Sequence, residues 1–373
     1  MMYALKSSIG MVTAAMLVSP LALAQPDSPM QTQAGDAKVD VLAEGLVHPW
    51  GMAFLPDGRL LVTEREGRLR ILDSDNSLSD PVEGVPEVFN QGQGGLLDVA
   101  LDPDFPRNSL VYLSFAEPGD GGASTALGRG RWEDDRIQDF EVIFRQQPKV
   151  SGGNHFGGRI VFTPQGTLFL TMGERFKFEP AQDLSNHLGT IAHLNLDGSI
   201  PEDNPFVGRE DAEGAIWSYG HRNIESAAMH PETGQLWIAE MGPRGGDELN
   251  LPEAGRNYGW PVVSWGEHYN GNDIADPPTR PEYADAAVHW TPVISPSGMA
   301  FYTGEAFPAW QGSVLIGGLT AQGIVRVDGN AEAEVERIPL GTRIRDVEQG
   351  PEGNVYVLTD QQNGKVMRLS PVE

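Results

Sequence analysis

The 373-residue chain contains no cysteine, which excludes a disulfide framework and a lipid anchor on an N-terminal cysteine. Basic residues are also scarce, because 26 lysines and arginines stand against 52 aspartates and glutamates, and the formal net charge is −26. A chain of this sign repels polyanions, so nucleic acid is not expected as a partner. Stability must therefore come from a large apolar core, for which 40% hydrophobic residues provide enough material.

Long hydrophobic runs are missing as well, and no segment approaches the eighteen consecutive apolar residues that a membrane span requires. The apolar segment Met11–Ala24 follows Lys6 and ends in an Ala-Leu-Ala motif before Gln25. This pattern is typical of a secretory signal peptide and predicts cleavage near Ala24–Gln25, with a periplasmic or secreted product. We therefore assign three segments: a signal peptide (1–24), a flexible leader (25–36) and a single domain (37–373).

Long helices are not expected, because 45 glycines and 28 prolines interrupt helical periodicity and separate short β-rich runs. One pattern recurs, in which two apolar runs flank a turn rich in proline and glycine. It occurs six times, at residues 52–64, 99–113, 160–170, 228–239, 299–316 and 347–358. This spacing, about 45 to 75 residues, predicts an all-β, six-bladed β-propeller of four-stranded antiparallel blades.

The ends of the domain and its longest interludes bear on how the propeller is built. Strand-like segments at 38–43 and 365–369 suggest that the first strand joins the last blade and closes the ring. Residues 175–215 and 243–297 are rich in Gly, Pro, Asn and charge, and they look too irregular for strands. Insertions of this kind on a rigid scaffold commonly build a binding face.

Polar stretches that break the repeat are the candidate functional sites. His155 lies among glycines before the third repeat, as either a general base with an ordinary pKa near 6.5 or a turn histidine bonded to backbone. Asp247 and Glu248 offer the oxygen ligands that Ca²⁺ prefers, although solvation alone also explains paired acids in a loop. The arginines that stand out in so acidic a chain form either an anion cradle or salt bridges at a rim: Arg222, Arg343 and Arg345.

Several common enzyme classes are excluded, because the chain has no nicotinamide fingerprint, P-loop, HExxH or GxSxG motif. Six other motifs, in order, resemble the soluble aldose sugar dehydrogenases that depend on pyrroloquinoline quinone (PQQ), relatives of glucose and sorbosone dehydrogenases. They span nearly the whole mature chain: QGQGGLLD (91–98), NHFGGR (154–159), GHRN (220–223), GPRGGDE (242–248), NYGWP (257–261) and RIR (343–345).

The resemblance implies oxidation of the C1 hydroxyl of an aldose to the lactone, with hydride transfer to PQQ and with Ca²⁺ beside the cofactor. It implies that His155 is the catalytic base. The implied cofactor-binding residues are Gln93, Arg222, Asn223, Tyr269, Thr320, Arg343 and Arg345. The carbonyls of Gly242 and Pro243 are the implied ligands of the active-site Ca²⁺, and Glu248 and Tyr258 are the implied ligands of a further, structural Ca²⁺.

Three positions depart from the family pattern. Glu225 stands where a substrate-contacting glutamine is expected, Met241 replaces glutamine or histidine, and Thr320 lies near the position of a lysine that faces the quinone. These changes bear on the preferred aldose and on cofactor affinity rather than on the fold.

The implied partners are an aldose substrate and an electron acceptor that the sequence does not identify, and the chain is expected to be a monomer or a homodimer. Two other functions fit the same scaffold. A metal-dependent propeller lactonase would use His155 and the acids without a quinone, but a neutral lactone has no need of the Arg343 and Arg345 pair. A noncatalytic propeller that binds sugars or proteins predicts that His155→Ala leaves every activity unchanged.

Overall fold

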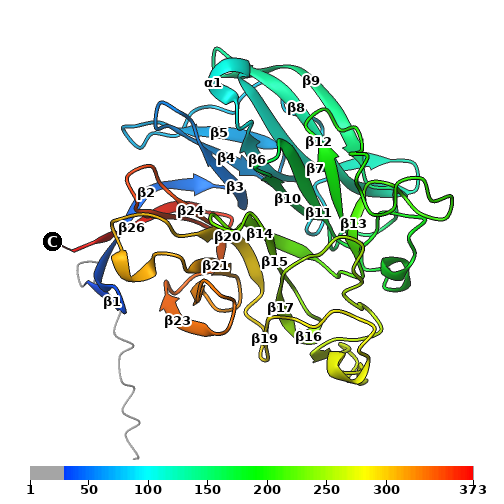
Figure 1. Ribbon diagram of the computed structural model, residues 1–373. Coiled ribbons are helices and arrows are strands. Elements are labelled where there is room, and N and C mark those ends of the chain that lie inside the picture. The colour runs from blue at the N-terminus through cyan, green and yellow to red at the C-terminus, as the bar shows by residue number, and fades with distance from the viewer. Residues whose placement is uncertain (1–28, 373) are drawn as a thin grey trace, which may run out of the picture.

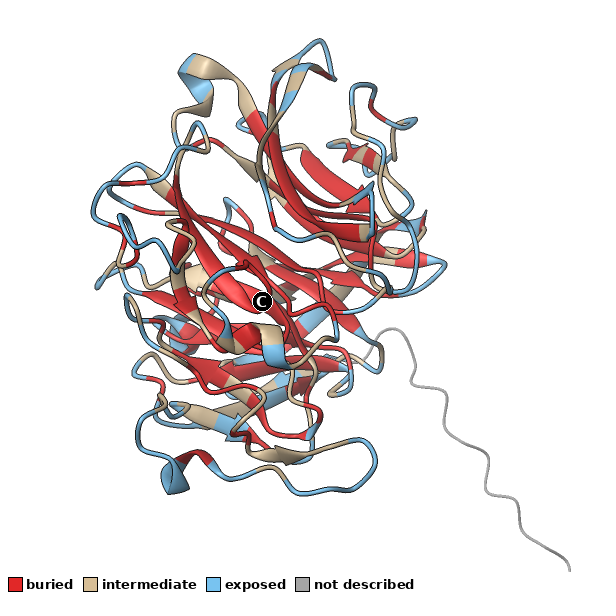
Figure 2. Ribbon diagram, turned by 90° about the vertical axis from the view of Figure 1, so that its right-hand side faces the viewer, coloured by how far each residue is buried: buried red, intermediate tan, exposed pale blue. Residues whose placement is uncertain are grey.

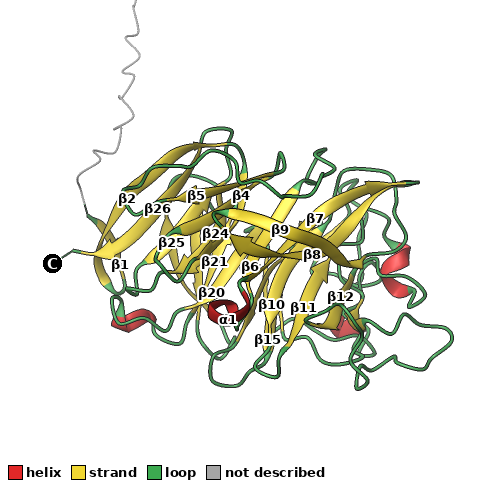
Figure 3. Cartoon of the chain, turned by 90° about the horizontal axis from the view of Figure 1, so that it is seen from above, coloured by secondary structure: helices red, strands yellow, loops and turns green. Residues whose placement is uncertain are grey.

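The computed structural model describes residues 29–372. The predicted signal peptide and its cleavage site lie outside this range. Within it, no helix has the length and hydrophobicity needed to cross a membrane. The helical segments in this range are short and lie in loops between strands (Figure 3): α1 (Phe105–Asn108) and the 3-10 turns Glu179–Gln182, Pro277–Thr279 and Pro308–Trp310.

Six antiparallel sheets surround a central axis (Figure 1), and we number them as blades 1 to 6 in chain order. Blade 1 contains β3 (Pro49–Phe54), β4 (Leu60–Glu64) and β5 (Arg68–Leu72). Blade 2 contains β6 (Leu96–Leu101), β7 (Leu110–Gly119), β8 (Gly122–Glu133) and β9 (Arg136–Arg145). Blade 3 contains β10 (Gly157–Phe162), β11 (Thr167–Met172), β12 (Thr190–Asn195) and β13 (Ile216–Tyr219).

The second half of the ring follows the same plan. Blade 4 contains β14 (Ile224–Met229), β15 (Leu236–Glu240), β17 (Asp247–Asn250) and β19 (Val288–Trp290), beside a small sheet of β16 (Arg244–Gly245) and β18 (Gly266–Glu267). Blade 5 contains β20 (Pro296–Phe301), β21 (Val314–Gly318), β22 (Gly323–Val327) and β23 (Glu334–Pro339). Blade 6 contains β24 (Ile344–Gln349), β25 (Val355–Thr359), β26 (Gly364–Pro371), β2 (Gly35–Leu46) and β1 (Met30–Thr32).

The structure confirms the six-bladed propeller. Each of the six sequence repeats coincides with the first two strands of a blade. The innermost strands β3, β6, β10, β14, β20 and β24 contact one another in that order, and β24 contacts β3, so the ring is closed. The blades differ in their number of strands, because blade 1 has three and blade 6 has five, while the other four have four each.

Ring closure uses the two ends of the chain, as the sequence predicts. Strand β2 pairs antiparallel with β26, with Val39 opposite Leu369, so blade 6 is built from both termini. The flexible leader predicted over residues 25–36 is wrong for its described part, because Met30–Thr32 form β1 and pair with the start of β2. Gln33 explains this order, since its backbone N–H and side chain bond Glu336 and the carbonyl of Val335 in blade 5.

The two long interludes also contain more strand than their composition indicates. Strand β12 lies within residues 175–215, and β17 and β19 lie within residues 243–297. These strands have three to six residues. Their alternation is hard to detect among glycines and prolines, and they are stabilised by the sheet that they join rather than by local propensity.

Buried residues concentrate on the strands, and exposed residues on the turns (Figure 2). Hydroxyl side chains also join neighbouring blades near the axis. Thr63 Oγ1 donates to the carbonyl of Leu97 (2.5 Å), and Thr171 Oγ1 donates to that of Ile224 (3.0 Å). Ser114 on β7 bonds blade 3 in the same way. These bonds satisfy backbone acceptors that would otherwise be buried without partners, and they fix the relative height of the innermost strands.

Candidate active site at the mouth of the channel

Most of the predicted site residues lie at one end of the propeller. The innermost strands run in the same direction, so the residues that precede them gather at the end where these strands begin, which we call the mouth. Gln93 precedes β6, His155 precedes β10, and Arg222 and Asn223 precede β14. Arg343 precedes β24 and Arg345 lies within it. The propeller therefore brings together residues that are up to about 250 positions apart in the sequence.

His155 is held in one orientation at the mouth. Its backbone has φ 55°, a left-handed conformation, and only 5% of the residue is exposed. Its backbone N–H donates to Oε1 of Gln93 (2.6 Å), and its ring Nδ1 lies 2.7 Å from Oε1 of Glu174. Because a carboxylate only accepts hydrogen bonds, Nδ1 carries the proton and Nε2 is left with a lone pair. Nε2 has no partner among residues 29–372, so it is the ring nitrogen available to a ligand.

The protonation of this pair suits a base. Burial lowers the pKa of His155 and outweighs the opposing influence of its hydrogen bond to Glu174, so the ring is neutral near pH 7. Burial alone would raise the pKa of Glu174, but hydrogen bonds from His155 and from backbone N–H groups lower it below its ordinary value. A charged Glu174 beside a neutral His155 orients the ring and would stabilise the imidazolium after proton uptake.

Glu174 was not among the predicted site residues, although the sequence carries a signal for it. It follows the end of β11, and Met172 at that end lies opposite Gly157 at the start of β10. A residue just after the second strand of a blade must therefore lie beside the loop that leads into the first strand. This register places Glu174 next to His155.

The loop after Glu174 adopts an unusual backbone conformation. Arg175, Phe176 and Phe178 have φ values of 59°, 58° and 66°. Left-handed conformations of such bulky residues cost on the order of 1 kcal/mol each and persist only where other contacts impose them. Here Glu174 accepts hydrogen bonds from the N–H groups of Lys177 and Phe178, and Arg175 donates to the carbonyl of Asn154 (2.9 Å). The loop presents Phe176, which is 38% exposed, with its ring 5.1 Å from that of His155.

Arg222 and Tyr269 lie beside this wall. Nη2 of Arg222 donates to the hydroxyl of Tyr269 (3.0 Å), whose side chain is otherwise largely exposed. Nη1 donates to the carbonyls of Met241 (2.9 Å) and Gly242 (2.8 Å). Nε of Arg222 is buried and has no partner among the described residues, so this guanidinium retains donor capacity. The structure thus brings Tyr269 to the mouth, as the short motif around it predicts.

Arg343 and Arg345 form a network with acids instead of an open anion cradle. Arg345 is buried and bonds both Glu225 and Oδ2 of Asp360 (2.8 Å), and Arg343 bonds the same oxygen of Asp360 (3.0 Å). The charges of these four side chains sum to zero. Although burial alone would raise the pKa of Asp360, Arg345 and the other partners hold it far below its ordinary value. The salt-bridge alternative therefore describes both arginines here, although Arg345 is buried rather than at a rim.

The remaining predicted cofactor residues are Asn223 and Thr320. Asn223 is fully buried; its Oδ1 accepts from the N–H of Gly157 (3.1 Å) and its Nδ2 donates to Glu225 (3.0 Å). It therefore couples the His155 loop to the Arg345 network. Thr320 is exposed and pairs with Ser295 (Oγ1 to Oγ, 2.5 Å). The structure does not bring Thr320 into contact with the other predicted cofactor residues.

Three of the four predicted Ca²⁺ ligands line a cavity of about 10 Å³, room for roughly one water-sized group. Gly242, Glu248 and Tyr258 line it together with Glu240, whereas Pro243 is buried outside the lining. Burial and the charge of Glu240 raise the pKa of Glu248, and Nδ2 of Asn250 donates to both carboxylates. Two neighbouring carboxylates and the Gly242 carbonyl are a donor set that suits Ca²⁺.

Asp247, in contrast, is engaged in the fold. Its oxygens accept hydrogen bonds from the N–H groups of Gly242 (2.8 Å), Ile294 (2.8 Å) and Ser295 (2.6 Å). Burial raises its pKa to about 6 despite these bonds. The Asp247 carboxylate is therefore buried and bonded to backbone, and it fixes the turn that carries Gly242. In the described part of the chain, no group of three or more His, Cys, Asp or Glu side chains is arranged to hold a metal.

Comparisons with known proteins agree with the fold and with the family resemblance. The family model for glucose/sorbosone dehydrogenases matches residues 46–368. Aldose sugar dehydrogenase YliI of Escherichia coli (strain K12) is 46% identical over 345 residues, which cover 89% of this chain and 92% of that protein. Quinoprotein glucose dehydrogenase B of Acinetobacter calcoaceticus is 28% identical over 450 residues, covering 95% of this chain and 93% of that protein.

Solved structures give the same result. The soluble aldose sugar dehydrogenase from Escherichia coli in its apo form has a TM-score of 0.86 at 44% identity, over 90% of this chain and 100% of that chain. The PQQ-bound aldose sugar dehydrogenase from Streptomyces coelicolor has a TM-score of 0.72 at 27% identity, over 92% and 99%. The chain therefore belongs to the glucose/sorbosone dehydrogenase family, a family of β-propeller oxidoreductases.

Proposed function

We propose that this protein is an exported aldose dehydrogenase that uses PQQ and Ca²⁺ to oxidise the C1 hydroxyl of a sugar to the lactone. The observation that carries the proposal is the His155–Glu174 pair. It places a neutral imidazole with a free Nε2 at the mouth of the propeller, beside the arginines and amides. The predicted signal peptide supports export.

The donor groups at the mouth fit a cofactor with several carboxylates. The buried Nε atoms of Arg222 and Arg345 have no partner among residues 29–372, and such donors are available to an anionic ligand. Gln93 and Asn223 add amide groups nearby, and Gly242, Glu240 and Glu248 provide oxygen ligands for Ca²⁺. When bound, PQQ supplies an electrophilic quinone that accepts a hydride from C1 of the sugar.

The residues of this chain would then act on the sugar hydroxyl. Nε2 of His155 accepts the proton of the C1 hydroxyl while the hydride leaves C1, and Glu174 stabilises the resulting imidazolium through Nδ1. Phe176 and Tyr269 lie on the side of the mouth next to His155 and provide exposed ring surface against which the sugar can pack. Burial of His155 keeps the imidazole neutral before the reaction.

An assay with an acceptor dye tests this function. We expect the purified mature protein to oxidise glucose or other aldoses only when both PQQ and Ca²⁺ are added, and His155→Ala to abolish turnover. His230→Ala, at the opposite end of the propeller, is the matched control and should keep full activity. Lactone hydrolysis without quinone would favour a metal-dependent lactonase. The absence of both activities and of quinone binding would favour a noncatalytic propeller.

Thermal unfolding tests the Ca²⁺ site separately. Neutralising the repulsion between Glu240 and Glu248 should stabilise the fold, so CaCl₂ should raise the Tm of the wild-type protein. Glu248→Gln removes one carboxylate of the pair, and we expect it to eliminate most of this increase. An equal rise in Tm for the variant would show that Ca²⁺ binds elsewhere.

A further inference from the structure

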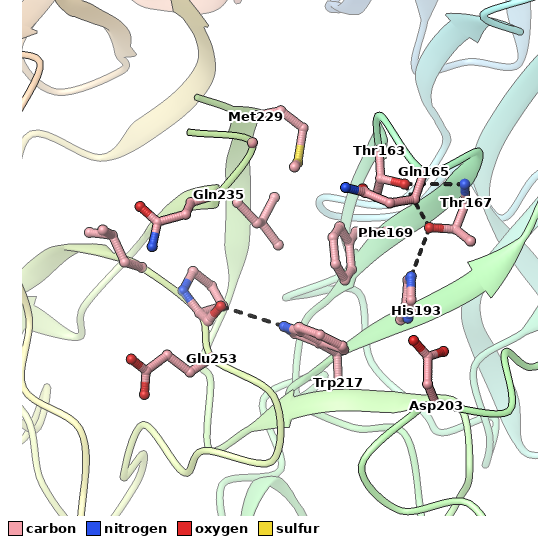
Figure 4. A pocket seen from close by; sticks show the side chains of 14 residues that line it. Thr163, Gln165, Thr167, Phe169, His193, Asp203, Trp217, Met229, Gln235 and Glu253 are labelled. Atoms are coloured by element: carbon pink, nitrogen blue, oxygen red, sulfur yellow. Dashed lines mark hydrogen bonds between the residues drawn. The ribbon is translucent and has the colours of Figure 1, made fainter. Parts of the chain in front are cut away.

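A second cavity, of about 400 Å³, lies between blades 3 and 4 at the end opposite the mouth (Figure 4). It is bounded by the turn 163–167 that joins β10 to β11, by the turn 229–236 that joins β14 to β15, and by residues 251–253. Strand β10 leads from the mouth to this end over a length of roughly 17 Å. The cavity is therefore separate from the His155 site, and it falls within the size range of small-molecule pockets, about 300–1,000 Å³.

The inner part of this cavity is apolar and aromatic. Phe169, His193 and Trp217 follow one another across β11, β12 and β13, and their rings are in contact, with centroids 4.8 to 5.3 Å apart. Phe169 and His193 are more than 90% buried, whereas Trp217 is half-buried and keeps ring surface open to the cavity. Met229 (Figure 4) adds apolar lining from blade 4, together with Leu236, Leu251 and Pro252.

His193 belongs to the support of this aromatic wall. Its Nε2 bonds Oγ1 of Thr167 (2.8 Å) and its Nδ1 bonds Oδ1 of Asn204 (2.6 Å), so both ring nitrogens are engaged. Burial lowers its pKa, which keeps the ring neutral near pH 7. The histidine therefore supplies neither a cation nor a free base to the cavity.

The rim of the cavity is polar and negatively charged. Gln165, Gln235, Asp203 and Glu253 are exposed around it, and no lysine or arginine lines it. Within the described residues the two amides and the Asp203 carboxylate make no side-chain hydrogen bond, and Glu253 has only an ion pair with Arg256 at 3.9 Å. Amides both donate and accept, and carboxylates accept, so the rim matches a ligand that carries several hydroxyl groups.

We propose that this cavity binds a pyranose ring of a neutral carbohydrate. The apolar C–H face of the sugar packs on Trp217, and its hydroxyls bond Gln165, Gln235 and the two carboxylates. An anionic ligand is excluded by the charge of the rim. An alkylammonium ligand fits less well, because cation sites surround the charge with several open rings and here only Trp217 is open.

This site would give the protein a carbohydrate contact that is independent of oxidation. Because it lies at the far end from His155, a sugar or a glycan chain held there leaves the mouth accessible to a substrate. The inference rests on the lining of the cavity alone and does not depend on the proposed dehydrogenase activity.

Methyl pyranosides are the appropriate probes, because the O1 methyl group removes the free anomeric hydroxyl and prevents oxidation at the mouth. We would titrate methyl glucoside, methyl galactoside and methyl mannoside into the full mature protein by calorimetry and by saturation-transfer NMR. We expect saturable binding of at least one, with a Kd on the order of 1 mM. Trp217→Ala should weaken it at least tenfold, and the surface variant Gln165→Ala/Gln235→Ala several-fold.

Two controls locate the binding. Trp132→Ala removes a half-buried tryptophan from blade 2, and His155→Ala alters the mouth; both should keep wild-type affinity. The proposal is overturned if none of the three pyranosides binds saturably. It is equally overturned if Trp217→Ala has no effect while His155→Ala abolishes binding, or if tetramethylammonium binds this cavity more tightly than the sugars.

Discussion

If PQQ binds at the mouth as proposed, replacing Glu225 by glutamine should tighten its binding about tenfold. The reason is that the Glu225 carboxylate bonds the guanidinium of Arg345 and competes there with a carboxylate of the cofactor. Glu225 is 4% exposed, bonds Nη1 of Arg345 and accepts a hydrogen bond from Asn223. Glutamine is nearly isosteric with glutamate, so the substitution removes the charge with little change in volume. Its single carbonyl oxygen can accept from only one of the two donors, Asn223 or Arg345. Arg345 retains Asp360 as a partner.

The magnitude follows from the repulsion between two carboxylates on one guanidinium. At a separation of about 5 Å and an effective dielectric constant of about 20, the repulsion is about 3 kcal/mol. Solvent and the neighbouring Arg343 reduce it by roughly half, and about 1.5 kcal/mol corresponds to about a tenfold change in Kd. Because the effect is electrostatic, raising the salt concentration should diminish the difference between the variant and the wild type.

The assay is a titration of the protein with PQQ in the presence of CaCl₂, followed by the change in tryptophan fluorescence. The increase in Tm on adding PQQ provides a second readout, which should be larger for Glu225→Gln. Glu202→Gln, an exposed acid away from the mouth, is the matched control. Unchanged or weaker PQQ binding by Glu225→Gln would refute the reasoning and assign Glu225 to a supporting role in the site.

Three further substitutions test the site and the fold. Glu174→Gln should lower kcat by about two to three orders of magnitude, with a smaller change in KM. Because the hydrogen bond to the Glu174 carboxylate raises the pKa of His155, its loss should shift the acid limb of the pH–rate profile to lower pH. Glu174→Asp should recover part of the rate. Arg159→Leu leaves two buried acids without their cation and should reduce the free energy of unfolding in urea by about 3–5 kcal/mol. Burial lowers the pKa of His187 to about 4, so protonation of this ring opposes folding, and the free energy of unfolding falls as the pH drops from about 6.5 towards 4. The His187→Asn variant lacks this titration. Between pH 7.5 and 4.5 its free energy of unfolding should therefore fall by about 2.5 kcal/mol less than that of the wild type.

The repeat pattern in the sequence was sufficient to predict the propeller, because each copy encodes two strands that are buried on both faces. The outer strands were harder to predict. Strand β19 has three residues and β17 has four, and neither shows clear alternation. Their pairing depends on a neighbouring strand that the fold brings to them, which local composition does not encode.

The site was predicted in part for a similar reason. Motifs at the starts of innermost strands identify His155, Arg222 and Arg345, but an acid that bonds each of them lies at or just after the end of a second strand. Glu174 follows β11, Asp360 follows β25 and Glu240 ends β15, and each bonds a group at the start of the innermost strand of its own blade. An acid at this repeated position therefore identifies a partner of the site residues, but only after the strands of each blade have been aligned with one another.

The presence of several arginines does not by itself identify an anion-binding site in this chain. In a chain with twice as many acids as bases, an arginine near the axis is expected to find a carboxylate, and both Arg343 and Arg345 do so. Arg222 differs, because carbonyl oxygens and the Tyr269 hydroxyl accept all its side-chain hydrogen bonds within residues 29–372. Dipoles of this kind orient a guanidinium without cancelling its charge, so Arg222 keeps its attraction for an anionic ligand at the mouth.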